Sequence, residues 1–216
     1  MDRKKITKPW KIYFKAFFVF LFVNMSLGQN TVIKNIDAET ISTISIDGNQ
    51  IFDIDITTSN TNYISCKSVV DGEYENMFQV ISNINGASLE LKLEQYQYTI
   101  INDDKRNAHK VVAVKLILDI PENINLSIVS DIANIKLKGN FDSVNVRLEE
   151  GFCNLSGQVK EGIIQTINGD IIVTTDNAEI YAQSNKGKIT LFPFKIFRSK
   201  LNLKSIKGNI NVRQSQ

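Results

Sequence analysis

Acidic side chains recur at one place in the second half of the chain, and they are the residues that could do chemistry. Asp131, Glu149 and Glu150 are spaced so that they share one turn if the chain stacks with a period of about 18 residues. Two carboxylates held close together can raise the pKa of one of them and supply a general acid. Acids and bases on adjacent turns of a parallel β-helix can cleave polysaccharides in this way.

Asp170 and Lys188 form a second charged set with the same spacing. A sugar-cleaving site built on these residues would need aromatic platforms, and the outward positions nearby supply only Phe152. The competing interpretation is a solvated corner, in which Asp170 and Lys188 make a surface ion pair worth about 0–1 kcal/mol. We expect the solvated corner, and a carbohydrate-active enzyme is the alternative.

The sequence lacks the residues that nucleophilic catalysis or a zinc site would need. His109 is the only histidine, and it lies in the polar run 102–110, which is typical of an exposed loop. Nucleophilic catalysis of the Ser-His-Asp or Cys-His type would depend on it. Zinc sites need several histidines and cysteines at short spacings. The sequence therefore predicts no catalytic residue, no cofactor and no metal, and we expect that the protein is not an enzyme.

The elements that position these side chains come from an internal repeat in the second half of the chain. Its five blocks share apolar residues at the fifth, seventh, fourteenth and sixteenth positions, and four of the five have glycine at the twelfth. The blocks begin at Glu122, Asn140, Gln158, Asp176 and Phe197, and their twelfth residues are Ala133, Gly151, Gly169, Gly187 and Gly208. A fixed period of this kind indicates a stacked architecture.

Within a block, apolar positions two apart place both side chains on one side of a strand. Each block therefore holds two short strands, and glycine follows only the first of them, where a corner needs positive φ or close backbone approach. The pattern predicts an all-β, single-stranded parallel β-solenoid with about 18 residues per coil, rising about 4.8 Å per coil. Right-handed winding is expected from the bias of parallel crossovers.

The domain organisation follows from where the repeat is regular. Residues 122–216 make up five coils of the solenoid, and residues 29–121 hold less regular β strands that form wider first coils or a cap. No linker rich in glycine, serine or proline separates the two parts, so we expect one continuous body. The strand edge left after Val212 is then free for self-association.

Two features of the repeat leave alternatives open. Cys153 shares a column with Ile135 and Ile171, which is typical of a small buried hydrophobe. A disulfide with Cys66 is the alternative in an exported chain.

The fourth block carries three extra residues and the aromatic residues Phe192, Phe194 and Phe197. They either cover an open end of the stack or form an exposed interaction patch.

Residues 1–28 have the pattern of a secretory signal peptide. A basic segment that includes Arg3 and Lys11 precedes the apolar run 16–25, and we expect cleavage before Gln29. The rival interpretation is a membrane anchor, which needs about 20 apolar residues.

Without residues 1–28 the chain has 19 basic and 22 acidic residues, a net charge of −3. The charge gives no case for a nucleic-acid partner.

The chain resembles the putative-adhesin family of exported bacterial envelope proteins. The resemblance rests on the strand 114–121 that ends in Pro121, followed by the coils 168–171, 186–189 and 207–210, each with Gly and then Ile two residues later. It implies a β-solenoid in the periplasm or on the surface of a Gram-negative cell. It supplies no catalytic residues. We expect an adhesin-like binding or structural protein whose partner is an envelope protein or a polysaccharide.

Overall fold

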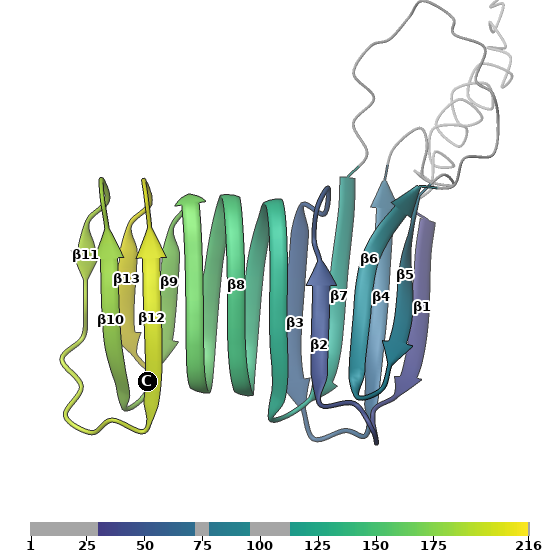
Figure 1. The fold of residues 1–216 in the computed structure, drawn as a ribbon, viewed down its shortest axis with the longest axis horizontal. Coiled ribbons are helices and arrows are strands. Elements are labelled where there is room, and N and C mark those ends of the chain that lie inside the picture. The colour runs from purple at the N-terminus through teal and green to yellow at the C-terminus, as the bar shows by residue number, and fades with distance from the viewer. Residues whose placement is uncertain (1–29, 72–77, 96–112, 216) are drawn as a thin grey trace, which may run out of the picture.

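The computed structural model describes residues 30–71, 78–95 and 113–215, and these residues form one mixed β-sheet of thirteen strands (Figure 1). The strands are β1 (Asn30–Asp37), β2 (Thr43–Asp47), β3 (Asp53–Ser59), β4 (Tyr63–Asp71), β5 (Phe78–Asn85), β6 (Ser88–Gln95), β7 (Ala113–Pro121), β8 (Ile124–Asn168), β9 (Ile171–Thr175), β10 (Ala178–Ser184), β11 (Ile189–Thr190), β12 (Ser199–Ser205) and β13 (Ile210–Gln214). The described residues contain no helix, so the all-β class is confirmed. The predicted signal peptide and His109 lie outside the described residues.

Alternation of apolar and polar residues sends every second side chain into the core. In β9, Ile171, Val173 and Thr175 are buried while the residues between them are half-buried. β8 is an extended segment of 45 residues that winds through successive turns along the long axis of the molecule (Figure 1). Ile, Val and Leu supply most of the buried row, and β-branched residues suit this pleated, half-buried surface.

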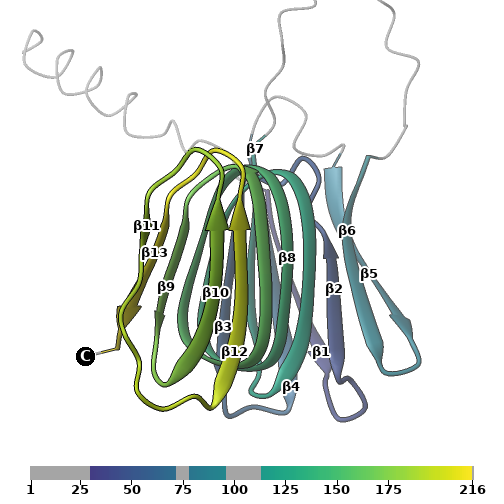
Figure 2. The same cartoon turned by 60° about the vertical axis from the view of Figure 1, so that its left-hand side comes forward.

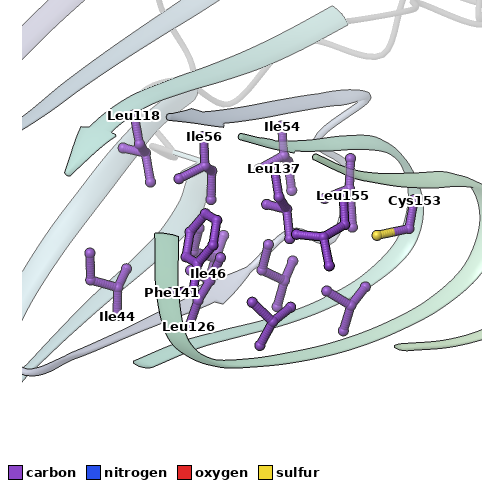
Figure 3. Close-up of a cluster of buried hydrophobic side chains, with 14 of the residues drawn as sticks. Ile44, Ile46, Ile54, Ile56, Leu118, Leu126, Leu137, Phe141, Cys153 and Leu155 are labelled. Atoms are coloured by element: carbon purple, nitrogen blue, oxygen red, sulfur yellow. The ribbon is translucent and has the colours of Figure 1, made fainter. Parts of the chain in front are cut away.

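Successive turns stack with the interval that the repeat predicts. Cys153 pairs with Ile171, and Leu155 pairs with Val173, in parallel register. Within β8, Ser143 donates a hydrogen bond of 2.7 Å to the side chain of Asn125, which lies 18 residues earlier in the chain. The inward side chains of the two faces meet in one hydrophobic cluster that runs through both halves of the chain (Figure 3).

The N-terminal strands extend the same stack. β2 and β3 lie parallel to β8, with Ile44 beside Leu126 and Ile54 beside Ile135. On their other side, β2 pairs with β6 and β3 pairs with β7, both in parallel. β1, β4 and β5 then add antiparallel pairs at this end, so the sheet is mixed.

The last block of the repeat does not stack on the fourth block, as chain order would predict. β12 pairs with β8 on one side and with β10 on the other, and β13 likewise lies between β9 and β11. Residues 199–214 are therefore inserted between the third and fourth blocks, as the order of strands in Figure 1 shows. Ile210 contacts Ile171 and Ile189 in register, and Val212 is buried. The free edge expected after Val212 belongs instead, among the described residues, to β10 and β11.

Close backbone approach explains the glycines at the twelfth position. A Cβ atom on Gly208 would overlap the carbonyl group of Gly169, and one on Gly187 would overlap the carbonyl group of Gly208. Gly151 also has a φ of 114°, a region that favours glycine. The glycine contacts follow the order of the layers rather than that of the chain, in agreement with the strand pairing of the last block.

Both cysteines are free and buried. Burial raises the pKa of the Cys153 thiol to about 12 and that of Cys66 to about 11. Cys153 pairs in register with Ile171, as the repeat predicts, and it lies in the hydrophobic cluster of Figure 3. The structure contains no disulfide between the two.

Candidate functional site

A groove of about 620 Å³ crosses the layers at the corner that follows the first strand of each block. Its walls are outward side chains of the eighth and tenth block positions, with the equivalent Asn49 from the N-terminal half. It lies near the carboxyl ends of β10 and β12, which point upward in Figure 2. We call it the corner groove, and its outward lining side chains are Asn49, Val129, Asp131, Arg147, Glu149, Gln165, Ile167, Gln183, Asn185, Lys204 and Ile206.

Hydroxyl groups at the ninth position hold the floor of the corner groove. Ser205 accepts a hydrogen bond of 2.7 Å from the backbone N–H of Gly208. Ser184 does the same for Gly187, at 2.9 Å. The Thr166 hydroxyl is 2.7 Å from the Gly169 carbonyl oxygen, to which it donates. These hydroxyls satisfy polar backbone groups that a tight corner would otherwise bury unpaired.

This hydroxyl row was missed in the sequence, although it leaves a signal there. A serine or threonine stands three residues before the glycine in Thr166-x-x-Gly169, Ser184-x-x-Gly187 and Ser205-x-x-Gly208. The side chains lie on the inward row but are polar, which interrupts the apolar pattern. Since the corner backbone depends on them, they position the eighth- and tenth-position side chains that face the groove.

The predicted carboxylate set is only partly brought together. Asp131 and Glu149 both line the corner groove, whereas Glu150 and Phe152 do not. The Oδ1 atom of Asp131 accepts backbone hydrogen bonds from Gln50, at 3.0 Å, and from its neighbour Ile132, at 2.8 Å. The carboxylate of Asp131 is thus engaged in fixing the turn, and it is poorly placed to exchange a proton with a substrate.

The expected ion pair between Asp170 and Lys188 does not form, because the inserted block separates them. Asn209 lies between the two residues: its backbone N–H donates to Asp170 Oδ1 at 2.7 Å. The Asn209 side-chain oxygen accepts from the backbone N–H of Lys188 at 2.9 Å. An amide therefore bridges three layers at a position where the sequence predicted a direct pair.

Charge does cross the layers on another outward face. Lys115 lies 2.6 Å from Asp55, and Lys136 approaches the same carboxylate at 3.8 Å from the other side. The hydrogen bond with Asp55 raises the pKa of the Lys115 ammonium. All three side chains are partly exposed, so these pairs add little stability.

The corner groove combines apolar and polar contacts along its length. Val129, Ile167 and Ile206 are exposed within it, and Arg147 and Lys204 add positive charge. The described residues that line it include no aromatic side chain. Groups that donate and accept hydrogen bonds recur here at the spacing of the layers, about 4.8 Å. The groove spans several layers, so an extended chain can contact more than one layer at once.

The three phenylalanines lie at the C-terminal end of the stack, away from the corner groove. Phe194 is half-buried and packs against the core. Phe192 is exposed, with its ring centroid 5.1 Å from that of Phe194. Phe197 is 62% exposed. Phe194 thus helps to cover the end of the stack, whereas Phe192 and Phe197 offer an exposed surface. An interaction at Phe192, Phe194 and Phe197 stays a prediction.

The described residues offer neither a metal cluster nor a membrane-spanning helix. No three His, Cys, Asp or Glu side chains within residues 30–71, 78–95 and 113–215 are grouped so that they could hold a metal ion. In the same part of the chain no helix has the length and apolar character needed to span a membrane.

Comparison with solved structures identifies similar folds. A putative cell adhesion protein from Clostridium sporogenes superposes with a TM-score of 0.62 at 14% identity, covering 87% of this chain and 100% of that one. A putative adhesin from Parabacteroides merdae matches with a TM-score of 0.43 at 12% identity, over 85% and 81% of the two chains. At these identities the first match shows the shared fold alone, and the second is too distant to carry an argument. No family model matches the sequence, and no curated protein does.

Proposed function

We propose that the protein is an exported, non-enzymatic β-solenoid that acts as an adhesin-like binding protein of the bacterial cell envelope. The observation that carries this proposal is the corner groove, because it repeats the same outward positions from layer to layer. A right-handed single-chain solenoid with about 18 residues per coil accounts for the parallel registers of β8, β9, β12 and β13. The similar fold of a protein described as a cell adhesion protein supports the same interpretation.

Export is supported by the N-terminal sequence pattern. The basic segment, the apolar run 16–25 and the small residues before Gln29 are those of a cleaved signal peptide. Periplasm and cell surface are both consistent with it. The free, buried state of Cys66 and Cys153 fits either place, since neither thiol is available for oxidation.

The ligand expected in the corner groove is an extended chain, either a polysaccharide or a segment of an envelope protein. A rigid stack places outward side chains at the same two positions of each layer, about 4.8 Å apart, so an extended ligand can contact several layers at once. Amide and charged groups such as Gln165, Arg147 and Lys204 suit hydroxyl or carbonyl groups. The exposed Ile167 and Ile206 suit the apolar faces between them.

The test is retention of envelope material by the purified protein, with variants in the groove. Ile167→Asp and Arg147→Ala both alter the walls of the corner groove without touching the core. Lys138→Ala is the matched control, since Lys138 is exposed and lies outside the groove. We expect the two groove variants to lose most of the retained polysaccharide or protein, and the control to keep it. Equal retention by all of them would remove the groove from the proposal.

The alternative, a carbohydrate-active enzyme, has one observation in its favour: Asp131 and Glu149 share the corner groove. Incubation of the protein with envelope polysaccharide, followed by sizing of the sugar, separates the two functions. Unchanged chain length together with binding supports the adhesin. Release of shortened saccharides that is abolished by Glu149→Gln would establish the enzyme instead.

A further inference from the structure

The end of the stack that the fourth block forms is an uncovered strand edge. Among the described residues β10 pairs only with β12, so its outer backbone groups face solvent. The inward columns are also incompletely covered here: Ile189 is 38% exposed and Leu191 42%, whereas Ile210, one layer inside, is 0% exposed. An edge with exposed apolar columns readily pairs with another strand.

Among the described residues, β1 and β5 are the edge strands at the other end, and β1 is protected in a way that β10 is not. Lys34 of β1 stands in register with Cys66, which is buried, so it occupies the row that faces the core. A charged side chain on that row discourages a further strand from adding. On β10 the corresponding row is Ala178, Ile180 and Ala182, without charge. β1 and β10 therefore differ in their capacity to pair.

We propose that β10 pairs with β10 of a second copy of this chain, antiparallel and around a two-fold axis at Tyr181. β10 runs from Ala178 to Ser184, so only this centre lets all seven residues overlap. Opposite residues then have matching chemistry. On the inward row Ile180 faces Ala182 of the second copy, and on the outward row Glu179 faces Gln183, so no like charges meet.

This contact joins the two stacks end to end and continues both their hydrogen bonding and their core. It also covers Ile189 and Leu191 on the opposite face of the terminal layer. Because the contact is two-fold symmetric, it closes after two copies. The proposal is independent of the ligand of the corner groove.

The test is the mass of the purified protein by sedimentation over a range of concentrations, with charge variants at one exposed residue. Gln183→Glu places a carboxylate opposite Glu179 of the second copy at two symmetric positions. The dimer should weaken roughly twofold to thirtyfold. Gln183→Lys places a cation there and should strengthen the dimer. Added salt should reduce both effects.

Gln165 provides the matched control, since it holds the same eighth position in an inner layer and also lines the groove. Gln165→Glu and Gln165→Lys should leave the dimer unchanged. A wild-type protein that stays monomeric at every concentration would overturn the proposal. So would Gln183 variants that shift the mass in the same direction, or Gln165 variants with equal effects.

Discussion

The inserted last block can be tested with a pair of substitutions at one column of the core. Ile210 and Ile189 occupy the same position of their blocks and pair with each other in register. Ile210 is 0% exposed and lies in an inner layer, whereas Ile189 is 38% exposed and lies in the terminal layer. If the blocks stacked in chain order, these two environments would be exchanged. Ile210→Ala and Ile189→Ala therefore report the order of the layers directly.

The expected difference follows from burial. Ile210→Ala leaves a closed cavity between the Ile171 and Ile189 layers, and replacement of a buried Ile by Ala costs about 2–5 kcal/mol. Ile189→Ala removes a side chain that is already more than one-third exposed, and solvent can fill the space that it leaves. It should lower the free energy of unfolding by about 1 kcal/mol, on the scale of apolar area removed from water. The two variants should thus differ by at least about 1 kcal/mol, with Ile210→Ala the less stable.

Urea unfolding followed by circular dichroism measures both variants on one scale. The comparison is made at one low protein concentration, so that pairing of β10 edges does not add to the stability of Ile189. The ratio of the two effects is the informative quantity, because both substitutions remove the same atoms. If Ile189→Ala were as destabilising as Ile210→Ala, or more so, the blocks would stack in chain order and our strand assignment would be wrong.

Three further predictions concern the corner and the core. Gly208→Ala forces a Cβ atom against the Gly169 carbonyl group and should lower stability by about 1–3 kcal/mol, read from thermal melts against wild type; an unchanged Tm would mean that this approach is not close. Thr166→Val removes the hydroxyl that contacts both Gly169 and Ser205, and should cost about 1–2 kcal/mol by urea unfolding, with Ser143→Val on the outer surface as a milder control. Cys153 has a pKa raised by burial to about 12, above the ordinary value of 9.0, so its contribution to stability is complete below pH 9 and is lost as the pH rises from 9 toward 12. Its thiol should resist alkylation in the native protein at pH 8 and react on denaturation, and rapid native labelling of Cys153 would contradict its burial.

Much of the fold could be predicted because the inward columns are explicit in the sequence. Apolar positions two apart define each strand, and the period of the repeat places Cys153 beside Ile171, as the structure confirms. The glycine column was predicted for the same reason, and close backbone contact is its main cause. The corner groove could not be predicted in the same way, since its outward residues vary in type. Its hydroxyl floor was missed because Thr166 and Ser205 are polar residues on the inward row.

The order of the layers could not be predicted, because every block presents the same apolar columns to its neighbours. Ile210 fits against Ile171 as well as against Ile189, and in the structure it contacts both. The period of the repeat determines which positions of two neighbouring layers face each other, but it does not determine the order in which the layers stack. The predicted pair of Asp170 with Lys188 failed for this reason alone: both residues are at the expected corner, and Asn209 of the inserted block lies between them.

The three extra residues of the fourth block lie in the connection where the chain reverses its direction along the stack. Lys188 and Asn209, which are bonded across the last turn, are 21 residues apart, whereas Asn125 and Ser143 of adjacent inner turns are 18 residues apart. A chain that continues the stack moves about 4.8 Å outward per turn, and a chain that returns inside its last turn moves about 4.8 Å inward. The axial step keeps its size of about 4.8 Å and reverses its direction, and the three extra residues lie in the connection that makes this reversal. The insertion that carries Phe192 and Phe194 is therefore placed where the last block turns back, and β10 is left at the edge as a consequence.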